Sequence, residues 1–265
     1  MSKVDTKDLL ELRRSTGAGM LDAKKALEAA GGDVEGARLW LRERGLAAAA
    51  SRGSQPSSQG AVKVVVGEGV SCVAEVVCET DFVAKTPELS ALLDEVARRV
   101  LSEGVEEARA GCKGLADDLA VRLKERIDVG RLVRVVHPEG AVVGSYLHMQ
   151  SGRGVNGVLV LLDKGSEDLA HDVAVHVAFT RPAYLAKDDV PAEEVETERA
   201  TLEALTRNEG KPEAALAKIV DGRLRGWYKE RCLLEQEYVR DEKRTIAQLL
   251  GDANVLQFVQ VIVGG

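Results

Sequence analysis

A polar stretch rich in glycine, serine and proline, residues 51–60 (SRGSQPSSQG), divides the chain into two parts with different periodicity. Before it, apolar residues recur at the spacing of amphipathic helices. After it, runs of valine begin that are typical of strands. Because such a stretch offers few apolar contacts and little regular structure, it is typical of a linker between domains. We therefore predict a helical module at residues 1–50, a linker at 51–60 and a larger core beyond it.

The module should contain three short helices between residues 4 and 45. The sequence Gly17-Ala18-Gly19 should end the first helix, and a second apolar stripe starts at Met20. The pair Gly31-Gly32 ends the second helix, and Gly45 should end the third, because glycine is common just past a helix end. A bundle of this size has a thin core, so we expect it to act mainly as a docking module.

Strands and helices alternate after the linker. In chain order we expect strands at 62–66 and 70–78, helices at 89–100 and 115–127, strands at 132–136, 142–147 and 158–162, and a helix at 169–179. The first two strands should form one hairpin, and the next two another, because turn residues separate them. Two strands followed by a helix occur in both 62–100 and 141–179. We therefore predict two similar halves of the core, 61–140 and 141–265.

Residues 190–239 interrupt this order with two helical patterns, one including Leu205 and one including Leu216, around a sharp turn at 208–212. They predict a helical hairpin that projects as an arm. Thr245 should cap a short helix. The last apolar run, 255–263, has no polar face and should be a central strand. The predicted fold class is α+β: a three-helix bundle, then two antiparallel-sheet-plus-helix subdomains with a projecting antiparallel helical hairpin.

The segment Glu79–Lys85 connects a predicted strand to a helix that should start at Thr86-Pro87. It carries Phe82, one of only three phenylalanines, beside Asp81. The ring can fold back and fasten the following helix to the sheet, which is the more ordinary outcome from spacing alone. Alternatively, it can project into an apolar slot of another protein while the carboxylate disturbs charged groups there. Both readings stay open at this point.

Composition restricts the compartment and the partners. A net charge of −7, from 43 acidic and 36 basic residues, argues against a broad nucleic-acid interface, which needs a basic excess. No apolar run reaches the length of a membrane span, and residues 1–5 show no signal-peptide core. Four scattered cysteines without a C-x-x-C pair are typical of reduced, buried thiols. We expect a cytoplasmic protein that contacts neither membrane nor nucleic acid directly.

Motifs for catalysis and cofactor binding are missing from the sequence. Neither a P-loop nor a G-x-S-x-G motif occurs, and the G-x-G-x-x-G match at 152–157 precedes a strand, so we expect a flexible loop there. His171 and His176 do not share a helix face, and His148 stands alone at a strand end. Cys78 lacks a basic neighbour and should be a buried thiol. The pattern indicates a protein-binding factor, not an enzyme, with no metal or cofactor of its own.

Two long segments resemble the signatures of the elongation factor Ts family. Residues 12–27 (LRRSTGAGMLDAKKAL) resemble its N-terminal signature, and residues 78–85 (CETDFVAK) resemble its second signature. Shorter similar segments follow in the same order: 144–148 (GSYLH), 175–178 (VHVA) and 210–212 (GKP). The resemblance covers nearly the whole chain.

The resemblance implies a guanine-nucleotide exchange factor that forms a complex with elongation factor Tu, displaces Mg²⁺ from it and promotes GDP release. In this family the N-terminal module is a UBA-like three-helix bundle that docks on the GTPase domain of the partner, and the helical hairpin is a coiled-coil projection. Phe82 would wedge between partner helices. The resemblance implies three sets of partner-binding residues: Thr80, Asp81, Phe82 and Val83 for Mg²⁺ displacement; Gly17, Ala18, Gly19 and Met20 in the module; and His148 in the core.

The sequence departs from the family in one respect. Many members continue past the last strand with a C-terminal helix that contacts the partner, so we expect that contact to be absent or replaced here. Two other classes of function stay open. A passive adaptor would bind through residues 4–45 without exchange activity, and an enzyme would use Cys78, Asp81 or His148 to convert a substrate.

Overall fold

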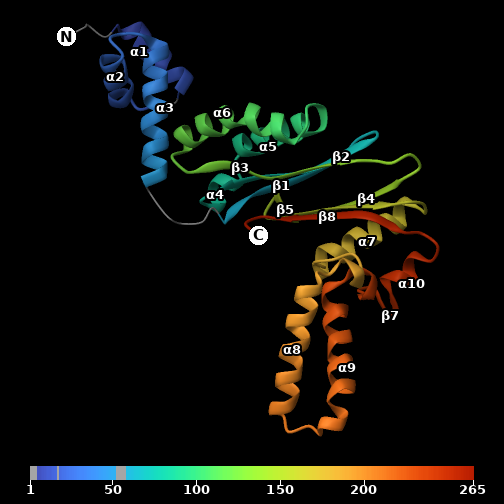
Figure 1. Ribbon diagram of the computed structural model, residues 1–265. Helices are drawn as coiled ribbons and strands as arrows, with labels where there is room; N and C mark the ends of the chain where they lie inside the picture. Colours follow the sequence, from blue (N-terminus) through green and yellow to red (C-terminus); the bar gives the residue numbers. More distant parts are fainter. Residues whose placement is uncertain (1–4, 17, 52–57) are drawn as a thin grey trace. The chain divides into compact units, whose positions relative to one another are not determined.

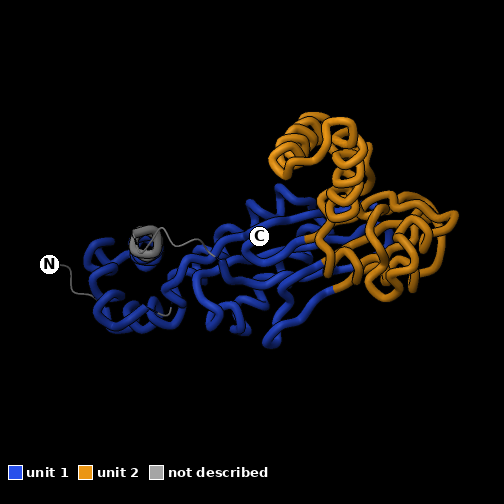
Figure 2. The backbone as a smooth tube through the Cα atoms, turned by 90° about the horizontal axis from the view of Figure 1, so that it is seen from below, with its two compact units in different colours: residues 1–136, 147–157, 261–265 blue, residues 137–146, 158–260 orange. Residues whose placement is uncertain are grey.

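The computed structural model describes residues 5–16, 18–51 and 58–265, with the backbone alone for 45–51 (Figure 1). The chain forms two compact units (Figure 2). The first comprises residues 1–136, 147–157 and 261–265, and the second comprises 137–146 and 158–260. The described residues combine helices with antiparallel sheets, which confirms the α+β prediction. No helix within these described ranges is long and apolar enough to cross a membrane.

The predicted three-helix module begins the first unit. Its helices are α1 (Thr6–Thr16), α2 (Met20–Ala29) and α3 (Val34–Ser51). Their apolar faces meet in a small core that includes Leu12, Leu27 and Leu41. The prediction that α3 ends at Gly45 is wrong. A leucine and four alanines follow this glycine, and their high helix propensity outweighs the cost of one glycine.

A three-stranded antiparallel sheet with the order β1-β2-β3 forms the body of the first unit. Its strands are β1 (Gln59–Val66), β2 (Val70–Cys78) and β3 (Ile127–Val136). The helices α5 (Pro87–Ser102) and α6 (Val105–Leu123) lie on one face of this sheet (Figure 1). Leu89, Val96 and Leu119 from these helices pack with Val76 of β2 in the main core of the unit. The β1–β2 hairpin confirms the prediction.

The helix predicted at 115–127 has different limits. The helix α6 begins earlier, at Val105. The sequence pattern missed its first part because small residues there give little apolar periodicity. The helix ends at Leu123, where Lys124 adopts a left-handed conformation with φ 58°. That turn reverses the chain, and Ile127 is already in β3.

The predicted hairpin between strands 132–136 and 142–147 does not form. β3 pairs with β2, from Val70↔Val136 to Cys78↔Ile127. The next strand, β4 (Val142–Gln150), belongs to a different sheet. β2 is buried along most of its length and has two edges to pair, so β3 fills the edge that β1 leaves open. A short turn between two strands does not by itself determine that they pair.

The second sheet has the order β4-β5-β8. β5 spans Arg153–Leu162 and β8 spans Val255–Ile262. The predicted flexible loop at 152–157 is wrong, because Ser151 (φ 52°) and Gly152 (φ 81°) alone form the turn from β4 to β5. Gly157 lies within β5, where a Cβ atom would approach Val62 Cγ1 to 2.7 Å. The glycines of this segment therefore allow close packing.

The prediction that the last apolar run is a central strand is also wrong. β8 lies at the edge of its sheet, and β5 is central. Val255 and Phe258 of β8 pack against the core of the second unit, whereas Leu256 is 45% exposed. The apolar residues of an edge strand can thus be covered by helices, so a run without a polar face does not identify a central strand.

The second unit is built around α7 (Glu167–Thr180), which packs with β5 and with α10 (Ile246–Leu250). The predicted cap of α10 is present, since Thr245 Oγ1 accepts a hydrogen bond from Gln248 N at 3.2 Å. Fully buried His176 on α7 accepts a hydrogen bond at Nδ1 from Val239 N (3.3 Å), so its Nε2–H donates to Gln236 Oε1 (2.9 Å). This pair ties α7 to the segment that follows the arm.

The predicted arm is formed by α8 (Ala192–Asn208) and α9 (Glu213–Arg231), which run side by side (Figure 1). Its seam includes Leu202, Leu216 and Val220. Leu205, which the sequence pattern assigned to the seam, is 48% exposed. Thr206 takes the inward position instead, and its buried hydroxyl is satisfied by donating to Leu202 O within the helix at 2.6 Å. Two short strands follow the arm: β6 (Glu237–Tyr238) and β7 (Asp241–Thr245).

Candidate protein-binding surface

The segment Glu79–Lys85 forms a single helical turn, α4 (Asp81–Ala84), between β2 and α5. Thr80 precedes this turn in an extended conformation, and its Oγ1 accepts a hydrogen bond from Val83 N at 3.3 Å. Thr86 caps the following helix in the same way, accepting from Leu89 N at 3.2 Å. The two caps satisfy backbone amides at both helix starts, which holds the turn in one conformation.

Phe82 projects from this turn and is 79% exposed. The reading in which the ring folds back onto the core is therefore wrong. Val83 and Ala84 occupy the inward side of the turn and are buried in the main core of the first unit. One helical turn cannot direct three consecutive side chains to one side, so the ring of Phe82 is left outside.

Glu125 fastens the start of the turn, and the sequence reasoning missed it. Its Oε2 accepts from Thr80 N at 3.0 Å and its Oε1 accepts from Thr80 Oγ1 at 2.5 Å. The left-handed turn at Lys124 brings this carboxylate to Thr80 although 45 residues separate the two. No local sequence signal identifies such a contact, because it depends on where β3 pairs.

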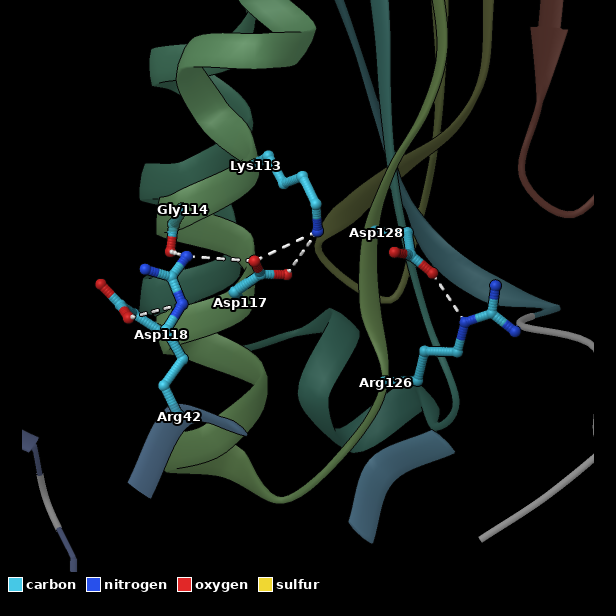
Figure 3. Close-up of polar contacts among 7 residues, drawn as sticks. All are labelled: Arg42, Lys113, Gly114, Asp117, Asp118, Arg126 and Asp128. Atoms are coloured by element: carbon cyan, nitrogen blue, oxygen red, sulfur yellow. Dashed lines mark hydrogen bonds and ion pairs between the residues drawn. The ribbon is translucent and has the colours of Figure 1, made fainter. Parts of the chain in front are cut away.

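Neighbouring contacts also hold the start of the α4 turn in place. Glu79 Oε1 accepts from Arg126 N at 3.0 Å, and the Arg126 side chain forms an ion pair with Asp128 at 2.6 Å (Figure 3). Cys78 Sγ donates to Thr80 O at 3.2 Å. Burial raises the pKa of the Cys78 thiol to about 12, so it stays protonated near neutral pH and is a poor nucleophile. The expectation of a buried thiol is confirmed.

Asp81 lies beside Phe82 and forms an ion pair with Lys85 one turn later. The hydrogen bond from Lys85 lowers the pKa of the Asp81 carboxyl below its ordinary value. The carboxylate is therefore ionised throughout the neutral range. The turn thus presents an apolar ring and a fixed negative charge together.

The module carries a second set of predicted site residues. Gly17 lies outside the described residues. Ala18 N donates to Thr16 Oγ1 at 3.3 Å, and Gly19 precedes the first turn of α2 in an extended conformation. Met20 is 47% exposed, and Leu21, which was not among the predicted residues, is 74% exposed. The start of α2 thus presents two adjacent apolar side chains.

His148 lies near the end of β4 and is exposed. It belongs to the first unit, as do the residues of the α4 turn and of the module. The three predicted sets therefore occupy separate elements of one unit. Within the described part of the chain, no group of three or more His, Cys, Asp or Glu side chains is arranged to hold a metal ion.

An aromatic ring held out on a capped turn, with exposed apolar residues on a small helical module, is typical of a protein-binding factor. The family model for elongation factor TS matches residues 79–265. The chain is 41% identical to elongation factor Ts of Micrococcus luteus over 283 residues, covering 100% of both chains. It is 41% identical to that of Paenarthrobacter aurescens over 277 residues (96% of each) and 39% identical to that of Deinococcus deserti over 260 residues (96% and 97%). The chain belongs to the elongation factor Ts family, whose role is in the elongation phase of translation.

Proposed function

We propose that this protein is a guanine-nucleotide exchange factor. It binds elongation factor Tu with GDP, displaces Mg²⁺ from the nucleotide site of that partner and promotes GDP release, so that GTP can bind. The observation that carries the proposal is the 79% exposure of Phe82 on a turn that Thr80 and Glu125 hold in place. Family membership supports the same assignment.

The energetics of exchange follow from linkage. A factor that binds the nucleotide-free partner more tightly than the loaded partner must weaken nucleotide binding by the same ratio. Mg²⁺ bridges the phosphates of a bound nucleotide and offsets their charge. Its loss leaves the phosphates less compensated, and GDP then dissociates faster. No covalent bond is made or broken, so the protein acts without being an enzyme and without a cofactor.

Each part of the α4 turn has a distinct task in this proposal. The ring of Phe82 enters between helices of the partner, and the carboxylate of Asp81 perturbs the region around the metal. Thr80 and Val83 act from the inward side: the first is hydrogen-bonded to Glu125 and the second is buried. An exposed ring that needs no rearrangement before docking loses little entropy on binding.

Other surfaces supply affinity. The region from Gly17 to Met20 docks the module on the GTPase domain of the partner, and His148 makes a further contact from the core. We place the complex in the cytoplasm, with no direct contact to nucleic acid or membrane. The proposal assigns no self-association.

The test is the release of fluorescent GDP from purified elongation factor Tu, followed with increasing concentrations of the factor. Wild type should accelerate release strongly. Phe82→Ala should lower the maximal release rate by at least about tenfold, because losing roughly 1.4 kcal/mol of stabilisation in the transition state for release changes the rate tenfold. Binding to nucleotide-free partner should largely persist through the other contacts.

Phe179→Ala is the matched control, since Phe179 is 78% exposed on α7 and lies outside the proposed site. It should release GDP at the wild-type rate. If Phe82→Ala accelerates release as much as wild type does, the ring of Phe82 does not carry the exchange. If both proteins bind the partner and neither accelerates release, the protein acts as a passive adaptor through its helical module. If wild type does not accelerate release at all, the exchange proposal is wrong.

A further inference from the structure

Arg42, on the module helix α3, reaches a carboxylate on α6 of the body of the first unit (Figure 3). Its Nη2 donates to Asp117 Oδ2 at 3.0 Å and lies 3.4 Å from Gly114 O. Its Nε lies 3.8 Å from Asp118 Oδ1. The guanidinium therefore meets three oxygen atoms of one helix, which suits its planar array of donors.

The receiving site on α6 is built for this contact. The Asp117 side chain is only 12% exposed, and Lys113 Nζ lies 3.1 Å from both of its carboxylate oxygens. A Cβ atom at position 114 would lie 3.3 Å from Arg42 Nη2, so glycine here lets the guanidinium approach the backbone. A shielded charge pair is screened less by salt than an exposed one.

The packing around the contact is open. A groove of about 470 Å³ adjoins it, lined by Leu41 of the module and by Leu92, Leu115 and Glu95 of the body, among others. The groove leaves Leu115 45% exposed, so this side of the module is not fully packed against the body. The polar contact at Asp117 is well placed to determine the orientation of α3 on α6.

We propose that Arg42 and Asp117 form a latch that fixes the orientation of the module, so that Met20 and Phe82 meet the same partner molecule together. Arg42 is a positioning residue in this scheme, since it acts by orienting α3 and not by touching the partner or the nucleotide. The expected effect of the latch on GDP release rests on the proposed exchange function, whereas its effect on the orientation of the module does not. Two binding surfaces held at the correct spacing act with a higher effective concentration than two surfaces joined loosely.

The first test measures orientation without the partner. Spin labels at Lys25→Cys on α2 and Ser90→Cys on α5 report the distance between module and body, and the four native cysteines are buried. The distance distribution should be narrow in the otherwise wild-type chain and broad in Arg42→Ala. Arg38→Ala is the matched control, because Arg38 lies one turn earlier on α3 and forms its ion pair with Glu35 of the same helix.

The second test measures GDP release from elongation factor Tu. Arg42→Ala should raise the factor concentration for half-maximal release by about threefold to tenfold, with an unchanged maximal rate, because only the effective concentration of the second contact falls. Asp117→Asn should behave like Arg42→Ala, and the double variant should be no worse than either single variant. Arg38→Ala should match wild type.

If the distribution of distances between the spin labels is as narrow in Arg42→Ala as in wild type, the latch proposal is wrong. An unchanged half-maximal concentration in Arg42→Ala overturns its role in exchange. Loss of maximal rate in place of apparent affinity also contradicts the proposal, because it would mean that Arg42 acts on the nucleotide site. If wild type fails to release GDP, the exchange function falls while the distance measurement still tests the latch.

Discussion

Thr80 donates a backbone amide and a hydroxyl hydrogen to one carboxylate, that of Glu125, and accepts from Val83 N. Two of these hydrogen bonds fix Thr80 just before the exposed ring of Phe82, and the third joins Thr80 to Val83 just after it. A side chain with this many partners is held in a single rotamer, and the turn that it begins is held in a single conformation. The position of the ring is thus determined by residues that do not touch it.

Glu125→Ala should loosen this turn. We expect a loss of about 1–3 kcal/mol in the free energy of unfolding, because a part-buried amide and hydroxyl lose a charged acceptor. Urea denaturation measures this loss, and hydrogen exchange at the Thr80 amide should accelerate. The maximal rate of GDP release should fall as well.

Glu139→Ala serves as the control for Glu125→Ala, since Glu139 is exposed in the turn after β3. It should change stability by less than about 0.5 kcal/mol. Equal stability and equal amide exchange in Glu125→Ala and wild type would show that Glu125 does not hold the turn.

Among the elements, the arm shows why an apolar residue in a helical pattern is not always buried. Leu205 and Leu216 both match the pattern, yet only Leu216 lies in the seam at 7% exposure. Arg223 Nη1 donates to Thr206 Oγ1 at 3.2 Å and its Nη2 reaches Glu209 at 2.6 Å. These polar contacts near the tip turn α8 so that Thr206 faces α9.

Leu216→Ala should therefore destabilise the arm by about 2–5 kcal/mol, because it leaves a cavity between two helices. Leu205→Ala should change stability by less than about 0.5 kcal/mol, because its side chain is 48% exposed. Hydrogen exchange of α8 and α9 distinguishes local opening of the arm from global unfolding. Similar effects of the two substitutions would contradict the seam described here.

At the scale of the whole molecule, the dependence of stability on pH contains a contribution from buried His176. Desolvation lowers the pKa of His176 below its ordinary value of 6.5, so the folded protein holds the ring neutral. The unfolded chain binds the proton more readily. This contribution is therefore complete above about pH 6.5 and decreases as pH falls below it toward the lowered folded pKa.

His176→Gln should reduce the slope of unfolding free energy against pH below 6.5, because it removes the titrating group. Urea denaturation between pH 5 and pH 8 measures this slope. His171→Gln is the control on the same helix, because His171 is exposed, with Nδ1 2.8 Å from Ser145 O. The same slope in His176→Gln and wild type would show that His176 is not the source.

The sequence alone determined the α+β class, the three-helix module, the β1–β2 hairpin, the arm and the caps at Thr86 and Thr245. It also singled out Phe82, and the two long signature segments identified the family that the comparisons then established. Each of these features depends on residues within a few positions of one another, where periodicity, turn chemistry and capping act directly.

Only the tertiary structure decided that β3 pairs with β2, that β8 is an edge strand and that Phe82 faces outward. It also brought Glu125 to Thr80 and Arg42 to Asp117, across 45 and 75 residues of chain. Strand pairing and long-range polar contacts depend on which surfaces are left uncovered after the local elements have formed. That competition involves the whole chain, so no short segment of sequence contains its result.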